Sequence, residues 1–129
     1  MRHFESRLQI ACVRWFRYQY RRYARCLHAV PNGLFSTVQA GRIAKMEGML
    51  AGVPDLELMV ARGGWHGLMI EMKNGTQGKQ SEAQKEQQSI LEREGYRYVI
   101  CRSFDDFERE ITNYMGAADK LEPNIYDEI

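Results

Sequence analysis

The spacing of apolar and polar residues in the first third of the chain predicts two helices with a break between them. Apolar or small side chains recur at steps of three and four over residues 5–27, which predicts one long helix. A short strand is expected at 28–30, before Pro31-Asn32-Gly33 interrupts regular structure. Residues 36–39, Ser-Thr-Val-Gln, have the form of a capping box, so a second helix should begin there and end near Gly48.

Residues 52–74, GVPDLELMVARGGWHGLMIEMKN, have the pattern of two β-strands joined by a tight turn. Gly63-Gly64 can adopt the positive φ angles of a two-residue hairpin turn, so strands are expected over residues 55–61 and 65–73. These strands are mostly apolar, yet they place Asp55, Glu71 and Lys73 at half-buried positions among apolar neighbours. That composition is costly for packing alone and suggests a chemical role.

The last part of the chain repeats clear start and stop signals. A polar loop at 74–79 leads to Ser81-Glu82-Ala83-Gln84, a second capping box that should open a helix to about residue 94, ended by Gly95. Residues 96–101 should form a strand, and Ser103 should cap a final helix. That helix keeps helical spacing of its apolar residues, Phe104, Phe107, Ile111 and Tyr114.

This order of elements defines the expected fold class. A hairpin followed by a helical crossover to another strand gives a mixed β-sheet with helices packed against it, an α/β fold. With 129 residues, 44% of them hydrophobic, the chain can build one core. We therefore expect a single domain over residues 1–115 and a loose acidic tail over residues 116–129.

Charge is distributed unevenly, although the net charge is only +1. Residues 1–45 hold nine Lys or Arg and one acid, a net of +8, while the remainder holds nine basic and sixteen acidic residues, a net of −7. A basic segment of this kind is typical of a surface that meets an anion, most often nucleic acid. The same arginines could instead pair with acids of the other half, and charge alone does not decide between the two.

Other features narrow the class of protein. No run of 18 apolar residues and no signal peptide is visible, so we expect a cytoplasmic protein without a membrane span. The three cysteines are an odd number at no metal-like spacing, which favours free buried thiols over disulfides or a zinc site.

The ionisable residues of the hairpin suggest a metal site. If Gly63-Gly64 is the centre of the turn, paired residues sum to 127, so Asp55 faces Met72 and lies diagonal or adjacent to Glu71. Two close carboxylates repel, burial penalises both charges, and a divalent cation relieves this. An all-oxygen site suits Mg²⁺ or Mn²⁺, and Lys73, on the same face as Glu71, could orient or deprotonate an attacking water. These groups suffice for phosphodiester hydrolysis, whereas a plain ion pair on a structural hairpin would predict no metal binding.

The motifs of the chain, taken in order, resemble the PD-(D/E)xK nuclease superfamily and, more closely, the VRR-NUC family of virus-type replication–repair nucleases. The resemblance covers residues 5–114 and is carried by ESRLQIACVRWFRYQY, PNG, KMEG, GVPDL, WHGL, IEMK, SEAQ and GYRYVICRS. It implies a mixed sheet flanked by helices and a metal-dependent nuclease core. By the same resemblance, Asp55 and Glu71 are metal ligands, Lys73 is the catalytic lysine, and the backbone carbonyl of Met72 completes the inner ligand set.

Two further residues match the family, each with a simpler alternative. Glu5 matches an acid on the first helix that approaches the metal through water, but it is also a favourable acid at a helix N-terminus. Gln84 matches a glutamine that faces the site, but it is also the capping-box partner of Ser81. Gln87 and Gln88 are expected at exposed helix positions, and the Asn32-Gly33 loop could line the cleft.

The expected substrate is DNA, because the arginines of the first helix, with Lys79 and Lys85 near the site, could bind phosphates without reading sequence. No recognition helix or zinc module is visible, which favours structure-selective cleavage. Stand-alone members of the resembling family are similar to junction resolvases and form homodimers, whose symmetry matches a four-way (Holliday) junction. The resemblance also implies a phage or prophage source, a role in DNA repair, a bacterial host cytoplasm and no organic cofactor. The alternative is a non-catalytic DNA-binding or assembly subunit that retains the nuclease fold.

Overall fold

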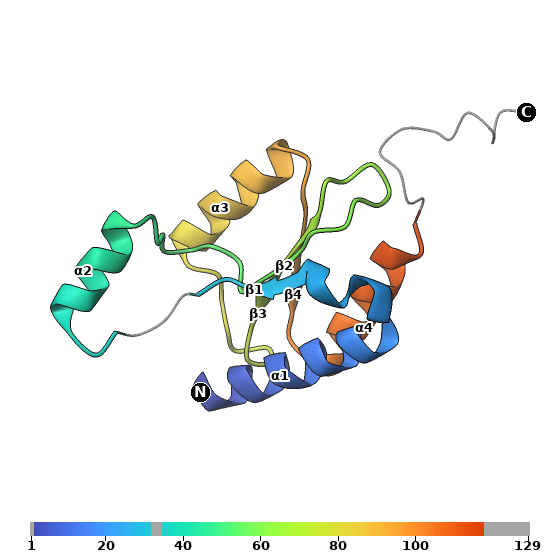
Figure 1. The fold of residues 1–129 in the computed structure, drawn as a ribbon, viewed down its shortest axis with the longest axis horizontal. Helices are drawn as coiled ribbons and strands as arrows, with labels where there is room; N and C mark the ends of the chain where they lie inside the picture. The colour runs from blue at the N-terminus through green and yellow to red at the C-terminus, as the bar shows by residue number, and fades with distance from the viewer. Residues whose placement is uncertain (1, 32–34, 118–129) are drawn as a thin grey trace, which may run out of the picture.

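The fold is a four-stranded mixed sheet between helices (Figure 1). The computed structural model describes residues 2–31 and 35–117. Its elements, in chain order, are α1 (Arg2–Gln19), the 3₁₀ helix η1 (Arg21–Cys26), β1 (Leu27–Ala29), α2 (Val38–Met46), β2 (Leu56–Leu58), β3 (Leu68–Met72), α3 (Glu82–Arg93), β4 (Arg97–Cys101) and α4 (Phe104–Met115). The predicted Asn32-Gly33 loop and most of the predicted tail lie outside the described residues.

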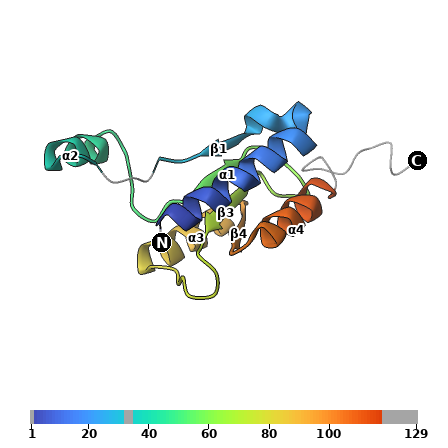
Figure 2. The same ribbon diagram turned by 90° about the horizontal axis from the view of Figure 1, so that it is seen from below.

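The strands follow the order β1-β2-β3-β4, and only the β3–β4 pair is parallel. Helix α3 is the crossover between these two parallel strands, so the predicted mixed α/β sheet is confirmed. Helices α1 and α4 cover one face of the sheet, and α3 lies on the other (Figures 1 and 2). The core lies between the sheet and the α1–α4 pair, and its largest fully buried helical side chains are Phe16 and Phe107.

The long N-terminal helix ends earlier than its periodicity predicts. The α-helical part stops at Gln19, Tyr20 leaves helical geometry with φ −120° and ψ 63°, and a 3₁₀ helix continues to Cys26. Leu27, predicted as the helix end, is instead the fully buried first residue of β1. The chain has to leave the axis of α1 to place Leu27 in the sheet, whereas the ring of Tyr20 stays stacked on Phe16.

Helix α2 stands apart from the body of the domain in both views (Figures 1 and 2). Its N-cap is Thr37, whose hydroxyl accepts a hydrogen bond from the Ala40 amide, so the predicted cap at Ser36 is wrong by one residue. Serine and threonine are both good N-cap residues, and Thr37 has the extended backbone conformation that an N-cap residue requires. None of the helices in the described part of the chain is both long and apolar enough to cross a membrane.

Several other local predictions are confirmed, whereas the hairpin strands predicted over residues 55–61 and 65–73 are shorter, at Leu56–Leu58 and Leu68–Met72. Ser81 and Gln84 form the complete capping box of α3, and Ser103 caps α4. Gly95 ends α3 with a φ of 95°. The three cysteines are free thiols, and two of them are fully buried in the core.

Candidate active site

The register of the hairpin places the two acids on one face of the sheet. The predicted turn is present, since Arg62 bridges Trp65 around Gly63-Gly64. The strands, however, pair as Leu56 with Ile70 and Leu58 with Leu68, so partners sum to 126 rather than to the predicted 127.

A one-residue bulge explains the shift. Between the Leu58–Leu68 pair and the Arg62–Trp65 bridge, residues 59–61 lie opposite residues 66–67, three against two. The observed register continues to place Asp55 opposite Glu71. The predicted pairing of Asp55 with Met72 is therefore wrong, and the correction brings both carboxylates to the face that looks toward α3.

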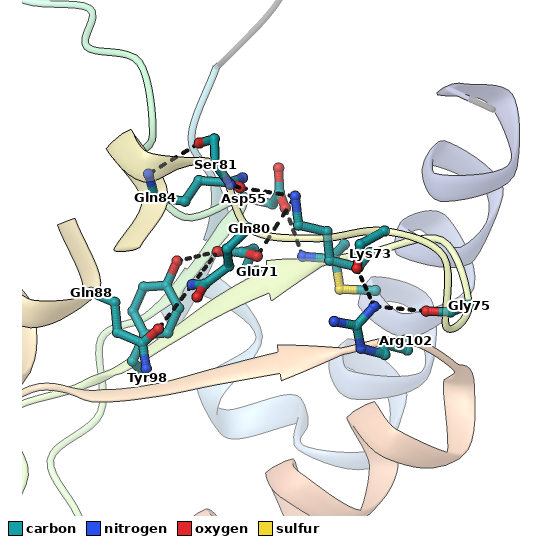
Figure 3. A network of polar contacts seen from close by, with 12 residues as sticks. Asp55, Glu71, Lys73, Gly75, Gln80, Ser81, Gln84, Gln88, Tyr98 and Arg102 are labelled. Carbon is teal, nitrogen blue, oxygen red and sulfur yellow. Dashed lines mark hydrogen bonds and ion pairs between the residues drawn. The ribbon is translucent and has the colours of Figure 1, made fainter. Parts of the chain in front are cut away.

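Glu71 is a fully buried acid in the middle of the site (Figure 3). Its Oε1 accepts a hydrogen bond of 2.5 Å from the Tyr98 hydroxyl and one of 3.1 Å from Gln80 Nε2. Its Oε2 is buried and has no hydrogen-bond partner in the described part of the chain. A buried carboxylate oxygen without a donor is costly, and a bound cation would satisfy it.

Asp55 is held from the neighbouring strand. Its Oδ2 accepts a hydrogen bond of 2.7 Å from the Met72 backbone amide. Burial raises the pKa of Asp55, the Met72 amide opposes this, and the nearby charges of Glu71 and Glu5 raise the pKa further. The carbonyl of a residue in a strand points to the same side as its amide. The Met72 carbonyl is therefore also directed toward the side of Asp55.

Lys73 is the cation nearest to these acids. Its Nζ lies 3.7 Å from Glu71 Oε2 and donates a hydrogen bond of 2.9 Å to Gln84 Oε1, with 14% of the side chain exposed. The same Gln84 oxygen accepts a hydrogen bond from the Ser81 amide. The two readings of Gln84 are thus compatible in geometry, because one oxygen serves the capping box and Lys73 together.

Glu5 lies at the edge of the site. It is half-buried near the N-terminal end of α1, which lies beside the loop between β3 and α3 in both views (Figures 1 and 2). Its charge acts on the carboxyl of Asp55. The described residues contain no cluster of three His, Cys, Asp or Glu side chains able to hold a metal ion, so Glu5 does not join the two acids as a direct ligand.

Arg102, the residue after β4, is hydrogen-bonded to the loop between β3 and α3. The Arg102 guanidinium donates to the carbonyl of Gly75 at 2.8 Å and to that of Gly78 at 2.6 Å (Figure 3). This contact fixes the segment that carries Gln80 over the site.

Sequence reasoning missed the polar residues behind Glu71. Tyr98 lies on β4, and Gln80 Nε2 also donates to Gln88 Oε1 at 2.8 Å. The expectation that Gln87 and Gln88 are exposed is wrong, since both are half-buried and Gln88 takes part in this network. Aligning 68–72 in parallel with 97–101 would have put Tyr98 on the face of Glu71.

The site residues fit a hard divalent cation. Asp55, Glu71 and the Met72 carbonyl offer oxygen ligands only, which suits Mg²⁺ or Mn²⁺ rather than zinc. The buried Glu71 Oε2 without a donor is the structural observation that supports a cation here.

The basic side chains of the first half remain at the surface. Arg7, Arg14, Arg21, Arg22 and Arg25 are exposed, and the ion pairs found among described residues all involve bases beyond residue 70. Some of these arginines contact rings instead, as Arg21 does with Tyr18. In the described part of the chain, these arginines are therefore not neutralised by the acidic half.

Together, a mixed sheet, a carboxylate pair and an adjacent lysine define a nuclease-type α/β domain. The VRR-NUC domain model matches residues 2–105. A solved structure described as a VRR_NUC domain protein is 29% identical, with a TM-score of 0.78 over 94% of this chain and 96% of that one. None of the curated proteins matches this sequence. The chain belongs to the VRR-NUC domain family, and DNA is the substrate class that a domain of this type implies.

Proposed function

We propose that this protein is a Mg²⁺- or Mn²⁺-dependent endodeoxyribonuclease that cuts branched DNA according to its structure. The observation that carries the proposal is the fully buried carboxylate of Glu71, whose Oε2 has no donor among the described residues and lies beside Lys73. Extending the register of β2 and β3 by one residue puts Asp55 opposite Glu71. A purely structural ion pair gains nothing from a buried acceptor left without a donor.

In this proposal Asp55, Glu71 and the Met72 carbonyl hold the cation, with Glu5 acting through water. When bound, the cation supplies Lewis-acid polarisation of the phosphate and neutralises developing charge. Lys73, steadied by Gln84, orients the attacking water and stabilises negative charge on the phosphate oxygens. The water oxygen would bond to phosphorus and release a proton to solvent, the bond to the 3′ oxygen would break, and that oxygen would take up a proton from solvent, which leaves 5′-phosphate and 3′-hydroxyl ends.

The exposed basic residues support a preference for the shape of DNA rather than for its sequence. The exposed arginines of α1 and η1, with Lys79, contact backbone phosphates in this proposal and carry no sequence information. We propose a homodimer, because two symmetric sites match the two-fold symmetry of a four-way junction. The role is in DNA repair or replication of a phage or prophage, in the cytoplasm of its host.

The test is cleavage of labelled duplex, flap and four-way-junction DNA with Mg²⁺, Mn²⁺ or EDTA. Lys73→Met, which keeps the length of the side chain, should reduce cutting by at least about a hundredfold, as loss of one electrostatic stabiliser typically does. The matched control is Lys45→Met, at an exposed lysine of α2, which should cut like the unaltered protein. Folding of each variant is checked by circular dichroism.

The competing function is a DNA-binding subunit without catalysis, which the exposed arginines would also support. Well-folded protein that binds junction DNA but cuts none of the substrates with either metal would establish that reading and refute the nuclease. Equal cutting by Lys73→Met and the unaltered protein would refute the assigned role of Lys73.

A further inference from the structure

A polar network reaches Glu71 from the side opposite Lys73, and all of it acts on one oxygen. Tyr98 and Gln80 both donate to Oε1, at 2.5 Å and 3.1 Å, while Oε2 receives no hydrogen bond from residues 2–31 or 35–117 (Figure 3). The two carboxylate oxygens are chemically identical. Their surroundings nevertheless differ, because both hydrogen-bond donors lie beside Oε1.

The two donors have fixed directions. Gln80 Nε2 has two hydrogens, and it donates to both Glu71 Oε1 and Gln88 Oε1. The Tyr98 hydroxyl is buried on β4 and can only donate to a carboxylate.

A carboxylate without such donors can rotate about its terminal bond, a torsion with a broad and roughly two-fold preference. Two donors on Oε1 restrict that rotation. They leave Oε2 on the side of Lys73, whose ammonium lies 3.7 Å away.

We infer that Tyr98 and Gln80 are positioning residues that hold Glu71 by Oε1 and present Oε2 as its cation-binding oxygen. This inference rests on the proposed function and extends it from the ligands to the groups that orient them. Neither residue touches the substrate. Their effect appears in the affinity for the divalent cation, because the orientation of a ligand is then fixed before the cation binds.

The test compares direct Mn²⁺ binding by full-length variants in the absence of DNA, measured by electron paramagnetic resonance of free Mn²⁺ and by calorimetry. Tyr98→Phe keeps the ring and removes one donor, and Gln80→Met keeps the length and removes the other. Each should raise the Kd for Mn²⁺ by about tenfold, within the range found when partners of metal ligands are removed.

Each variant has a matched control. Tyr96→Phe makes the same change two residues away, at a ring that contacts His66 rather than Glu71. Gln77→Met makes the second change at an exposed position of the same loop. Both controls should keep the Kd within about twofold, since surface changes away from a site are nearly neutral.

The cleavage assay supplies a second readout. In Tyr98→Phe the Mn²⁺ concentration for half-maximal cutting should rise about tenfold, while kcat at saturating Mn²⁺ stays within about threefold, because the ligand is misoriented but present. A merely structural role for Tyr98 would lower Tm and leave the Mn²⁺ affinity of the folded protein unchanged.

The possible outcomes separate this inference from the function on which it rests. Mn²⁺ binding by the unaltered protein, with an unchanged Kd in both variants, would refute the positioning role and leave the nuclease intact. A failure of the unaltered protein to bind Mn²⁺ at all would refute the proposed metal site. A raised Kd in both variants, with both controls unchanged, would establish the role.

Discussion

Glu71→Gln should stabilise the metal-free protein and remove its response to metal. The substitution keeps Oε1, which can still accept from Tyr98 and Gln80, and replaces the negative Oε2 by an amide nitrogen. It thereby removes a buried charge whose Oε2 has no donor, and it relieves the repulsion that helps to raise the pKa of Asp55.

The size of the effect follows from two contributions of opposite sign. A buried charged acceptor without a partner costs about 1–3 kcal/mol. Losing the attraction to Lys73 at 3.7 Å offsets part of this gain, and Lys73 keeps Gln84 as its hydrogen-bond partner. The net gain in the free energy of unfolding is about 1 kcal/mol, which for 129 residues raises Tm by roughly 4 °C.

Metal should reverse this order of stability. At a Mn²⁺ concentration a hundred times its Kd, the unaltered protein gains about 2.7 kcal/mol, or roughly 10 °C in Tm. Glu71→Gln lacks the anionic ligand and should gain little.

The assay is thermal unfolding followed by circular dichroism, with Mn²⁺ or with EDTA. Glu57→Gln, at a half-buried acid of β2, is the control and should follow the unaltered protein within about 2 °C in both conditions. The reasoning is refuted if Glu71→Gln unfolds at a lower temperature than the unaltered protein in EDTA, or if Mn²⁺ raises both Tm values equally.

Three further predictions concern stability and thiol reactivity. The Arg102 amide holds the pKa of Asp106 below its ordinary value, so Asp106→Asn should lower Tm above about pH 4, and the difference should fade as the pH drops through that pKa. Gly52→Ala should lower the free energy of unfolding, measured in urea, by about 2–4 kcal/mol, since φ is 88° and the new Cβ would lie 2.7 Å from the backbone of α3. The control Gly48→Ala, with open space around the new Cβ, should lower it by only about 1–2 kcal/mol. At pH 8, Ellman's reagent should react quickly with at most one thiol, that of half-buried Cys26, because the other two are fully buried with pKa values of about 12; two or three fast thiols would contradict this burial.

Features set by neighbouring residues were predictable from the sequence. The caps at Ser81 and Ser103 and the stop at Gly95 depend on chemistry within a few positions, and each is found where expected. The Gly63-Gly64 turn belongs to the same group, because both residues take the positive φ angles that the turn requires. Asp55, Glu71 and Lys73 lie close together for a related reason, since they lie at or next to the ends of two strands joined by a predictable turn.

Features set by distant contacts were not predictable. The break after Tyr20 depends on where Leu27 must enter the sheet, and the bulge at 59–61 depends on how the two strands fit the core. The contact of Tyr98 with Glu71 joins residues 27 positions apart and requires the parallel register of β3 and β4. The spacing of residues along the chain fixes neither the break, nor the bulge, nor the register of β3 with β4.

The bulge makes the relative position of the two acids depend on whether the two arms of the hairpin tip differ by an odd or an even number of residues. Because side chains alternate between faces, the difference in residue count between the two arms decides whether Asp55 and Glu71 share a face. Insertions that lengthen one arm by an even number of residues keep the two acids on the same face of the sheet, whatever residues are inserted. An insertion of an odd number of residues has to be accommodated by a second bulge. Otherwise one of the two acidic side chains would point toward the core. The length of this tip, more than its composition, is therefore what natural variation and protein engineering must respect.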